Sequence, residues 1–124
     1  MFAFGSAQLT PVGQSRLDNM ATEARQAGIT SVTSMTIVGY TDPLGSEASN
    51  QTLSEKRAAV VRDYVISKGT PASVVRAEGR GETQLKVTEA DCKTKGEAKT
   101  RQALIACLAP NRRVEISATG VQSK

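Results

Sequence analysis

Apolar and polar residues alternate along residues 113–119. Three apolar and three polar side chains fall on opposite faces: Val114, Ile116 and Ala118 against Arg113, Glu115 and Ser117. This alternation predicts a strand in a sheet with one face packed against the core and the other exposed to solvent. Three further stretches have the apolar content of strands, at residues 2–4, 32–40 and 74–78.

Apolar residues at helical spacing separate these strands. The predicted helices cover residues 11–27, about 49–68 and 97–108. Thr10 before Pro11 is typical of an N-cap followed by the first helical position. A helix-ending residue follows each range, at Gly28, Gly69 and Pro110. The alternation of elements therefore predicts a layered α/β fold.

The order βαβαβ(α)β predicts a two-layer α/β sandwich, with the helices on one face of a mixed sheet. The chain has 124 residues, which suits a single domain. We expect one domain over residues 1–124 with a core of about 2–118. Residues 84–109 form an insertion that is polar and irregular as far as about residue 96, and residues 119–124 form a short tail.

One charged residue interrupts the apolar stripe of the second helix. At 100° per residue, Arg57 falls between Leu53 and Val60. A guanidinium cannot lose its proton to escape burial, so it must reach solvent or meet a carboxylate. Asp42 ends the preceding strand, and a strand end and the start of the next helix share one rim of the sheet.

Two interpretations of Asp42 and Arg57 remain open at this point. They can form a salt bridge that fastens the loop to the helix. They can instead stay a few ångströms apart and hold a ligand with both charges, such as an amino-acid head group. Its ammonium suits the aspartate, and its carboxylate suits the planar fork of the arginine.

The overall charge limits the classes of partner. The net charge is +4 and aromatic residues make up 3%, with the basic residues spread along the chain. Nucleic acid is not expected, because it requires a basic face with aromatic residues for stacking. No apolar run reaches the roughly 20 residues of a membrane span, and residues 1–10 lack the pattern of a signal peptide. We expect any membrane attachment to lie in a segment absent from this chain.

The chain contains two cysteines, Cys92 and Cys107, and no histidine. This composition argues against a zinc site, and no metal or other cofactor is expected. The cysteines can form a disulfide or remain free thiols. Closing a loop of about 15 residues contributes about 3 kcal/mol in the chain-entropy model, which favours the disulfide and an oxidising compartment.

An ordered set of short motifs resembles the OmpA C-terminal-like domain, which also occurs in the Pal lipoprotein and the flagellar stator protein MotB. The matching residues are Gly39-Tyr40-Thr41-Asp42, Gly45-Ser46, Asn50, Leu53-Ser54, Arg57-Ala58, Gly79, Gly81-Glu82 and Asn111-Arg112-Arg113-Val114-Glu115. The resemblance extends from Phe2 to about Ser117.

This resemblance implies a periplasmic domain that binds peptidoglycan non-covalently and anchors the outer membrane to the cell wall. It implies that Asp42 and Arg57 hold the free amino-acid end of diaminopimelate in the stem peptide. Asn50 and Arg112 are implied as further ligand-binding residues. Asn111 and Arg113 are expected to be structural.

Two departures from the family pattern stand out. Tyr40 occupies a position where histidine is more common, with little expected effect. The cysteine-bearing insertion resembles that of some proteobacterial OmpA proteins, which supports a Cys92–Cys107 disulfide.

Other functions have weaker support. Asp42 and Glu47 could be compared with a glycosidase carboxylate pair, but they share one polar loop, with no feature that would make one of them a general acid. No catalytic residue is therefore assigned, and no enzymatic activity is expected. The alternative is a protein–protein or dimerisation module of an outer-membrane protein, with no direct cell-wall ligand.

Overall fold

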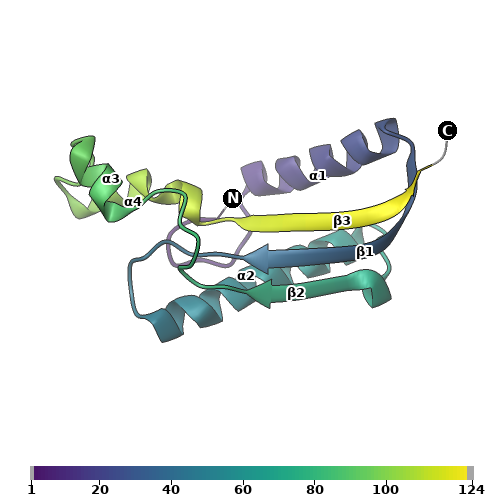
Figure 1. Ribbon diagram of the computed structural model, residues 1–124, viewed down its shortest axis with the longest axis horizontal. Coiled ribbons are helices and arrows are strands. Elements are labelled where there is room, and N and C mark those ends of the chain that lie inside the picture. Colours follow the sequence, from purple (N-terminus) through teal and green to yellow (C-terminus); the bar gives the residue numbers. More distant parts are fainter. Residues whose placement is uncertain (1, 123–124) are drawn as a thin grey trace.

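The computed structural model describes residues 2–122. Its main elements are α1 (Pro11–Gln26), β1 (Ile29–Gly39), α2 (Glu47–Ser67), β2 (Val75–Gly79), α3 (Glu89–Thr94), α4 (Arg101–Cys107) and β3 (Val114–Gln122). The three strands form one sheet in the order β2-β1-β3 (Figure 1). Strand β2 runs parallel to β1, and β3 runs antiparallel to it. The sheet is therefore mixed, as predicted.

The core lies between one face of the sheet and the helices α1 and α2. Leu17 of α1 and Val61 of α2 join Ile37 of β1 in one buried apolar cluster. Ile37 is paired in register with Ile116 of β3, which packs against the same cluster. These contacts confirm the predicted two-layer α/β sandwich.

The predicted first strand at residues 2–4 is wrong. Phe2 makes only an isolated antiparallel bridge with Leu9 and does not join the sheet. The backbone carbonyl of Phe2 accepts a hydrogen bond from Arg112, and that of Ala3 accepts one from Arg57. Two arginine side chains thus donate to backbone carbonyls that would accept hydrogen bonds from a neighbouring strand if this segment joined a sheet.

The insertion contains two short helices, one more than predicted. Residues 89–94 form α3 rather than irregular chain, and the second helix begins at Arg101 instead of residue 97. Thr88 and Asp91 form a reciprocal capping box at the start of α3, a signal overlooked in a polar stretch. Both helices lie beyond the end of the sheet, away from α1 (Figure 1).

The last strand is also longer than expected. It extends to Gln122, so residues 119–122 belong to the sheet rather than to a tail.

Two glycines allow α2 to lie directly against the sheet. Gly39 and Gly79 are paired in register at the ends of β1 and β2. A Cβ atom on Gly39 would collide with the backbone carbonyl of Ser54, and one on Gly79 would collide with the Ser54 hydroxyl. Without side chains here, the first turns of α2 approach the point where β1 ends.

Candidate functional site

Residues 40–42 leave the end of β1 and are held by neighbouring loops. The Tyr40 amide donates to the Arg113 carbonyl at 2.9 Å, and the Thr41 amide donates to the Gly81 carbonyl at 2.8 Å. The Gly81 amide in turn donates to the Ser54 hydroxyl of α2 at 2.9 Å. These hydrogen bonds fasten the segment to the residues before β3 and after β2, and the latter are bonded in turn to α2.

The Asp42 carboxylate is buried and has a defined orientation. Its Oδ1 accepts a hydrogen bond from the Leu44 amide, and its Oδ2 accepts one from Arg112 Nη1, both at 3.1 Å. The bond to Leu44 forms a short turn of the kind that aspartate favours. Asp42 and Arg112 thus form a buried ion pair.

Arg57 projects from the buried face of α2 and is only 1% exposed. Its guanidinium donates to three backbone carbonyls: Nε to Ser6 at 2.9 Å, Nη1 to Tyr40 at 3.0 Å and Nη2 to Ala3 at 3.1 Å. It also lies 5.2 Å from the centre of the Phe2 ring. Carbonyl oxygens satisfy this charge without a direct carboxylate partner.

The electrostatic surroundings of Arg57 link it to both members of the ion pair. Burial lowers the pKa of Arg57 to about 10, an effect opposed by the nearby carboxylate of Asp42 and reinforced by the positive charge of Arg112. The guanidinium is still charged at neutral pH. The direct Asp42–Arg57 salt bridge that the sequence left open is not found, because Asp42 pairs with Arg112.

Asn50 connects the first turn of α2 to the loop that carries Asp42. Its Nδ2 lies within hydrogen-bond distance of the backbone carbonyls of Asp42 and Leu44, at 3.3 and 3.1 Å. It also lies 3.3 Å from Oε1 of Glu82. The amide nitrogen is therefore engaged in holding the loop.

A hollow of about 610 Å³ opens where the N-terminal segment, the loop after β1 and the first turns of α2 meet. Asp42, Asn50 and Arg57 all line it, and Arg112 does not. The structure thus brings three of the four predicted binding residues to one hollow. Arg112 lies outside the hollow and is connected to it by its ion pair with Asp42.

Thr41 also lines this hollow and was missed as a candidate. The residue is 1% exposed, and its hydroxyl oxygen is buried without a hydrogen-bond partner. An unmatched buried hydroxyl is uncommon and requires a reason. Its position beside Asp42 in the Thr-Asp pair was the only sequence signal.

Two other hollows, of about 840 and 680 Å³, lie elsewhere on the described surface. The first is bordered by the N-terminal segment and α2, and the second lies between α1, the sheet and the end of α2. Neither has a buried pair of opposite charges among its lining residues. The hollow at Asp42 and Arg57 is therefore the candidate site.

Comparison with known proteins identifies the family of this chain. Residues 1–102 match the OmpA family. This chain belongs to the OmpA family. The expected family is confirmed, and it is not a family of enzymes.

The OmpA-family chain is 46% identical over 121 residues to outer membrane protein A of Atlantibacter hermannii. The match covers 98% of this chain and 48% of that protein, so the chain spans about half the length of this relative.

Two solved structures share the fold. The cell wall anchor of the T6SS from Pseudomonas aeruginosa has 26% identity and a TM-score of 0.63, covering 98% of this chain and 76% of that one. The peptidoglycan-associated lipoprotein from Burkholderia pseudomallei has 22% identity and a TM-score of 0.67, covering 95% and 86%.

In this OmpA-family domain, Asn111 and Arg113 have the contacts of structural residues. Asn111 Oδ1 accepts from the amides of Lys86 and Val87, and its Nδ2 donates to the Val87 carbonyl. Arg113 stacks on the Tyr40 ring at 4.0 Å and its Nε donates to Glu115 Oε2. These bonds close the base of the insertion and support the strand end.

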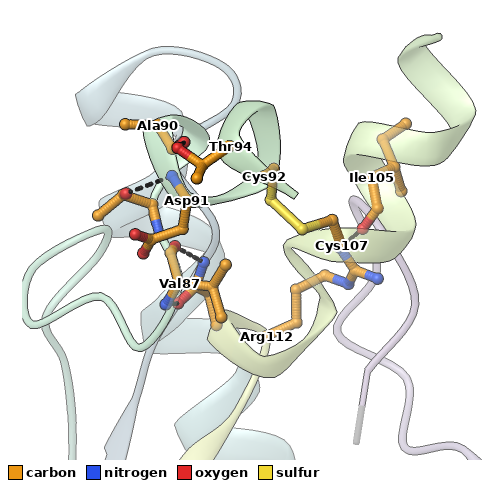
Figure 2. The surroundings of a disulfide bond; sticks show 10 residues. Val87, Ala90, Asp91, Cys92, Thr94, Ile105, Cys107 and Arg112 are labelled. Carbon is orange, nitrogen blue, oxygen red and sulfur yellow. Dashed lines mark hydrogen bonds between the residues drawn. A yellow bond between two sulfur atoms is a disulfide. The ribbon is translucent and has the colours of Figure 1, made fainter. Parts of the chain in front are cut away.

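The predicted disulfide is present between Cys92 of α3 and Cys107 of α4 (Figure 2). No cluster of three potential metal-binding side chains occurs within residues 2–122. None of the helices in that range has the length and hydropathy of a membrane-spanning segment.

Proposed function

We propose that this OmpA-family domain binds peptidoglycan non-covalently, by taking the free amino-acid end of diaminopimelate into the hollow at Asp42 and Arg57. The observation that carries this proposal is that two buried, opposite charges line one hollow without bonding to each other. Such a pair suits a zwitterion better than it suits a neutral or singly charged ligand.

Unused hydrogen-bonding capacity supports this assignment. Arg57 has five N–H donors and uses three on carbonyls, which leaves two for a ligand carboxylate. Each Asp42 oxygen accepts one bond from the protein, so both retain capacity for an ammonium group. The unmatched Thr41 hydroxyl lies at the same hollow and can donate to the carboxylate.

The other predicted residues contribute in different ways. Asn50 lines the hollow, and its side-chain nitrogen holds the loop. Arg112 lies outside the hollow, where its hydrogen bond to Asp42 neutralises and orients that carboxylate. The ligand set is therefore Asp42, Arg57 and Asn50 in contact, with Arg112 as their support.

Relatives supply the biological setting. The structural neighbours include a peptidoglycan-associated lipoprotein and a cell wall anchor, and the relatives with high identity are outer membrane proteins. On this basis the domain lies on the periplasmic side of the outer membrane and attaches it to the cell wall.

Sedimentation with purified sacculi tests this function. The oxidised chain should pellet with sacculi, and free diaminopimelate should release it. Pimelate, which has the same two carboxylates without the amino groups, is the matched control and should not compete. Binding that ignores both competitors would favour a protein–protein or dimerisation role over the zwitterion site.

A further inference from the structure

Arg112 joins the candidate site to the insertion. Its Nη1 donates both to Asp42 Oδ2 at 3.1 Å and to the backbone carbonyl of Ile105 at 2.9 Å. Its Nε donates to the Phe2 carbonyl at 3.2 Å. One buried guanidinium therefore connects the carboxylate of the hollow to helix α4 and to the N-terminal segment.

The contact on α4 is made at the end of the helix. Ile105 lies in the last turn, where backbone carbonyls lack partners within the helix. A cationic donor there satisfies such a carbonyl and is favoured by the helix dipole. The position of α4 therefore determines where the Ile105 carbonyl lies relative to Arg112.

The disulfide links helix α4 to helix α3. It has 7 residues, none of them fully buried, and α3 has 6. Helices this short are marginal in water without outside support. Cys107 ends α4 and is bonded to Cys92, which is completely buried in α3. Figure 2 shows the Arg112 side chain extending toward this last turn, close to Cys107.

We infer that the Cys92–Cys107 disulfide is a positioning element of the binding site, acting through Ile105 and Arg112 to hold Asp42 ready for the ligand. This inference rests on the proposed function and adds to it a dependence on the redox state of the chain. Arg112 is then a positioning residue rather than a ligand contact.

Loss of the disulfide would change the hollow through charge. When α4 moves, Arg112 loses the Ile105 carbonyl and is held less firmly against Asp42. Arg57 is also a buried guanidinium close enough to Asp42 to feel its charge. Asp42 is then free to turn toward Arg57, and a direct pair between them would compete with the ligand for both charges.

Reduction of the disulfide provides the test. Dithiothreitol supplies two electrons and two protons: the S–S bond breaks, two thiols form, and dithiothreitol closes into its cyclic disulfide. We expect the reduced chain to bind sacculi about five-fold or more weakly than the oxidised chain, the lower end of typical coupling between sites. Circular dichroism should show the fold retained. Equal affinity of the two forms would overturn the inference.

Two variants separate positioning from general loosening. Cys92→Ala with Cys107→Ala should bind like the reduced chain and should not respond to dithiothreitol. In an Arg112→Gln background, reduction should have little further effect, because the coupling passes through Arg112. A loss of the same factor in that background would show that the disulfide acts by another route, against the inference.

A ligand-free measurement keeps the two proposals distinguishable. In the oxidised chain, the Arg112 Nε–H should exchange slowly with solvent in NMR spectra, because it is buried and bonded to Phe2. Its exchange should accelerate at least several-fold on reduction. If the oxidised chain ignores sacculi, the proposed function fails, and unchanged exchange of this N–H would separately reject the link to the disulfide.

Discussion

The Asp42 carboxylate accepts its ion-pair hydrogen bond from Arg112, at 3.1 Å, and not from Arg57. Arg57 lines the same hollow and directs its donors to backbone carbonyls. Each of the two charges is thus satisfied enough to be buried and still has capacity for a ligand. A direct Asp42–Arg57 pair would neutralise both charges and leave neither of them for a ligand in the hollow.

Replacing the carboxylate with its neutral isostere tests the role of charge. Asp42→Asn keeps an oxygen for Arg112 but loses attraction for an ammonium group. We expect sacculus affinity to fall by about 2 kcal/mol, roughly thirtyfold. Sedimentation over a range of sacculus concentrations measures the change. Glu47→Gln in the first turn of α2 is the control, and an unchanged affinity of Asp42→Asn would contradict a charge-based site.

Removing Arg57 should affect folding as well as binding. Arg57→Ala leaves the carbonyls of Ala3, Ser6 and Tyr40 without this donor, and we expect a loss of about 3 kcal/mol or more in unfolding free energy. Urea denaturation measures the loss.

Arg57→Lys separates these two roles. Lysine keeps the positive charge but not the planar set of donors, so stability should recover in part while sacculus binding stays weak. Full recovery of binding in this variant would show that charge alone suffices at this position.

The Thr41 hydroxyl should matter only when a ligand is present. Thr41→Val preserves the shape of the side chain and removes a buried group without a partner, so the free protein should be equally stable or slightly more stable. Sacculus affinity should fall several-fold if the hydroxyl donates to the ligand. Thr41→Ser retains the hydroxyl and should bind like the unmodified chain. Equal affinity for the valine variant would remove Thr41 from the site.

Acid should weaken the start of α3. The backbone N–H of Thr88 donates to Asp91, and this bond, followed by the Thr88 side-chain contact, lowers the pKa of that carboxyl. A lowered folded-state pKa means that the stabilisation is present above the unfolded value and is lost as pH falls through the folded value. An NMR titration of the Asp91 carboxyl measures this pKa, and Thr88→Ala should reduce the shift. An Asp91 pKa at the ordinary value would contradict the capping box.

The spacing of apolar residues and the residues that begin and end helices were sufficient to predict most of the fold. Strands and helices each have a characteristic spacing of apolar residues, and Thr10 and the glycines mark where helices begin and end. These features depend on local backbone and solvation preferences, which neighbouring residues largely set. Arg57 was predictable as a functional candidate for the same reason, since a charge within an apolar stripe conflicts with burial. The cysteine pair was predictable because loop closure favours it and the family resemblance supports it.

The partners that these charges take could not be predicted from the sequence and follow from long-range packing. Asp42 and Arg112 are far apart in sequence, and their pairing depends on β1 and β3 being neighbours in the sheet. The carbonyls that satisfy Arg57, the unmatched Thr41 hydroxyl and the contact between Arg112 and α4 depend on the same long-range packing. Residue patterns report which groups must be buried or satisfied, whereas three-dimensional packing determines which group satisfies which.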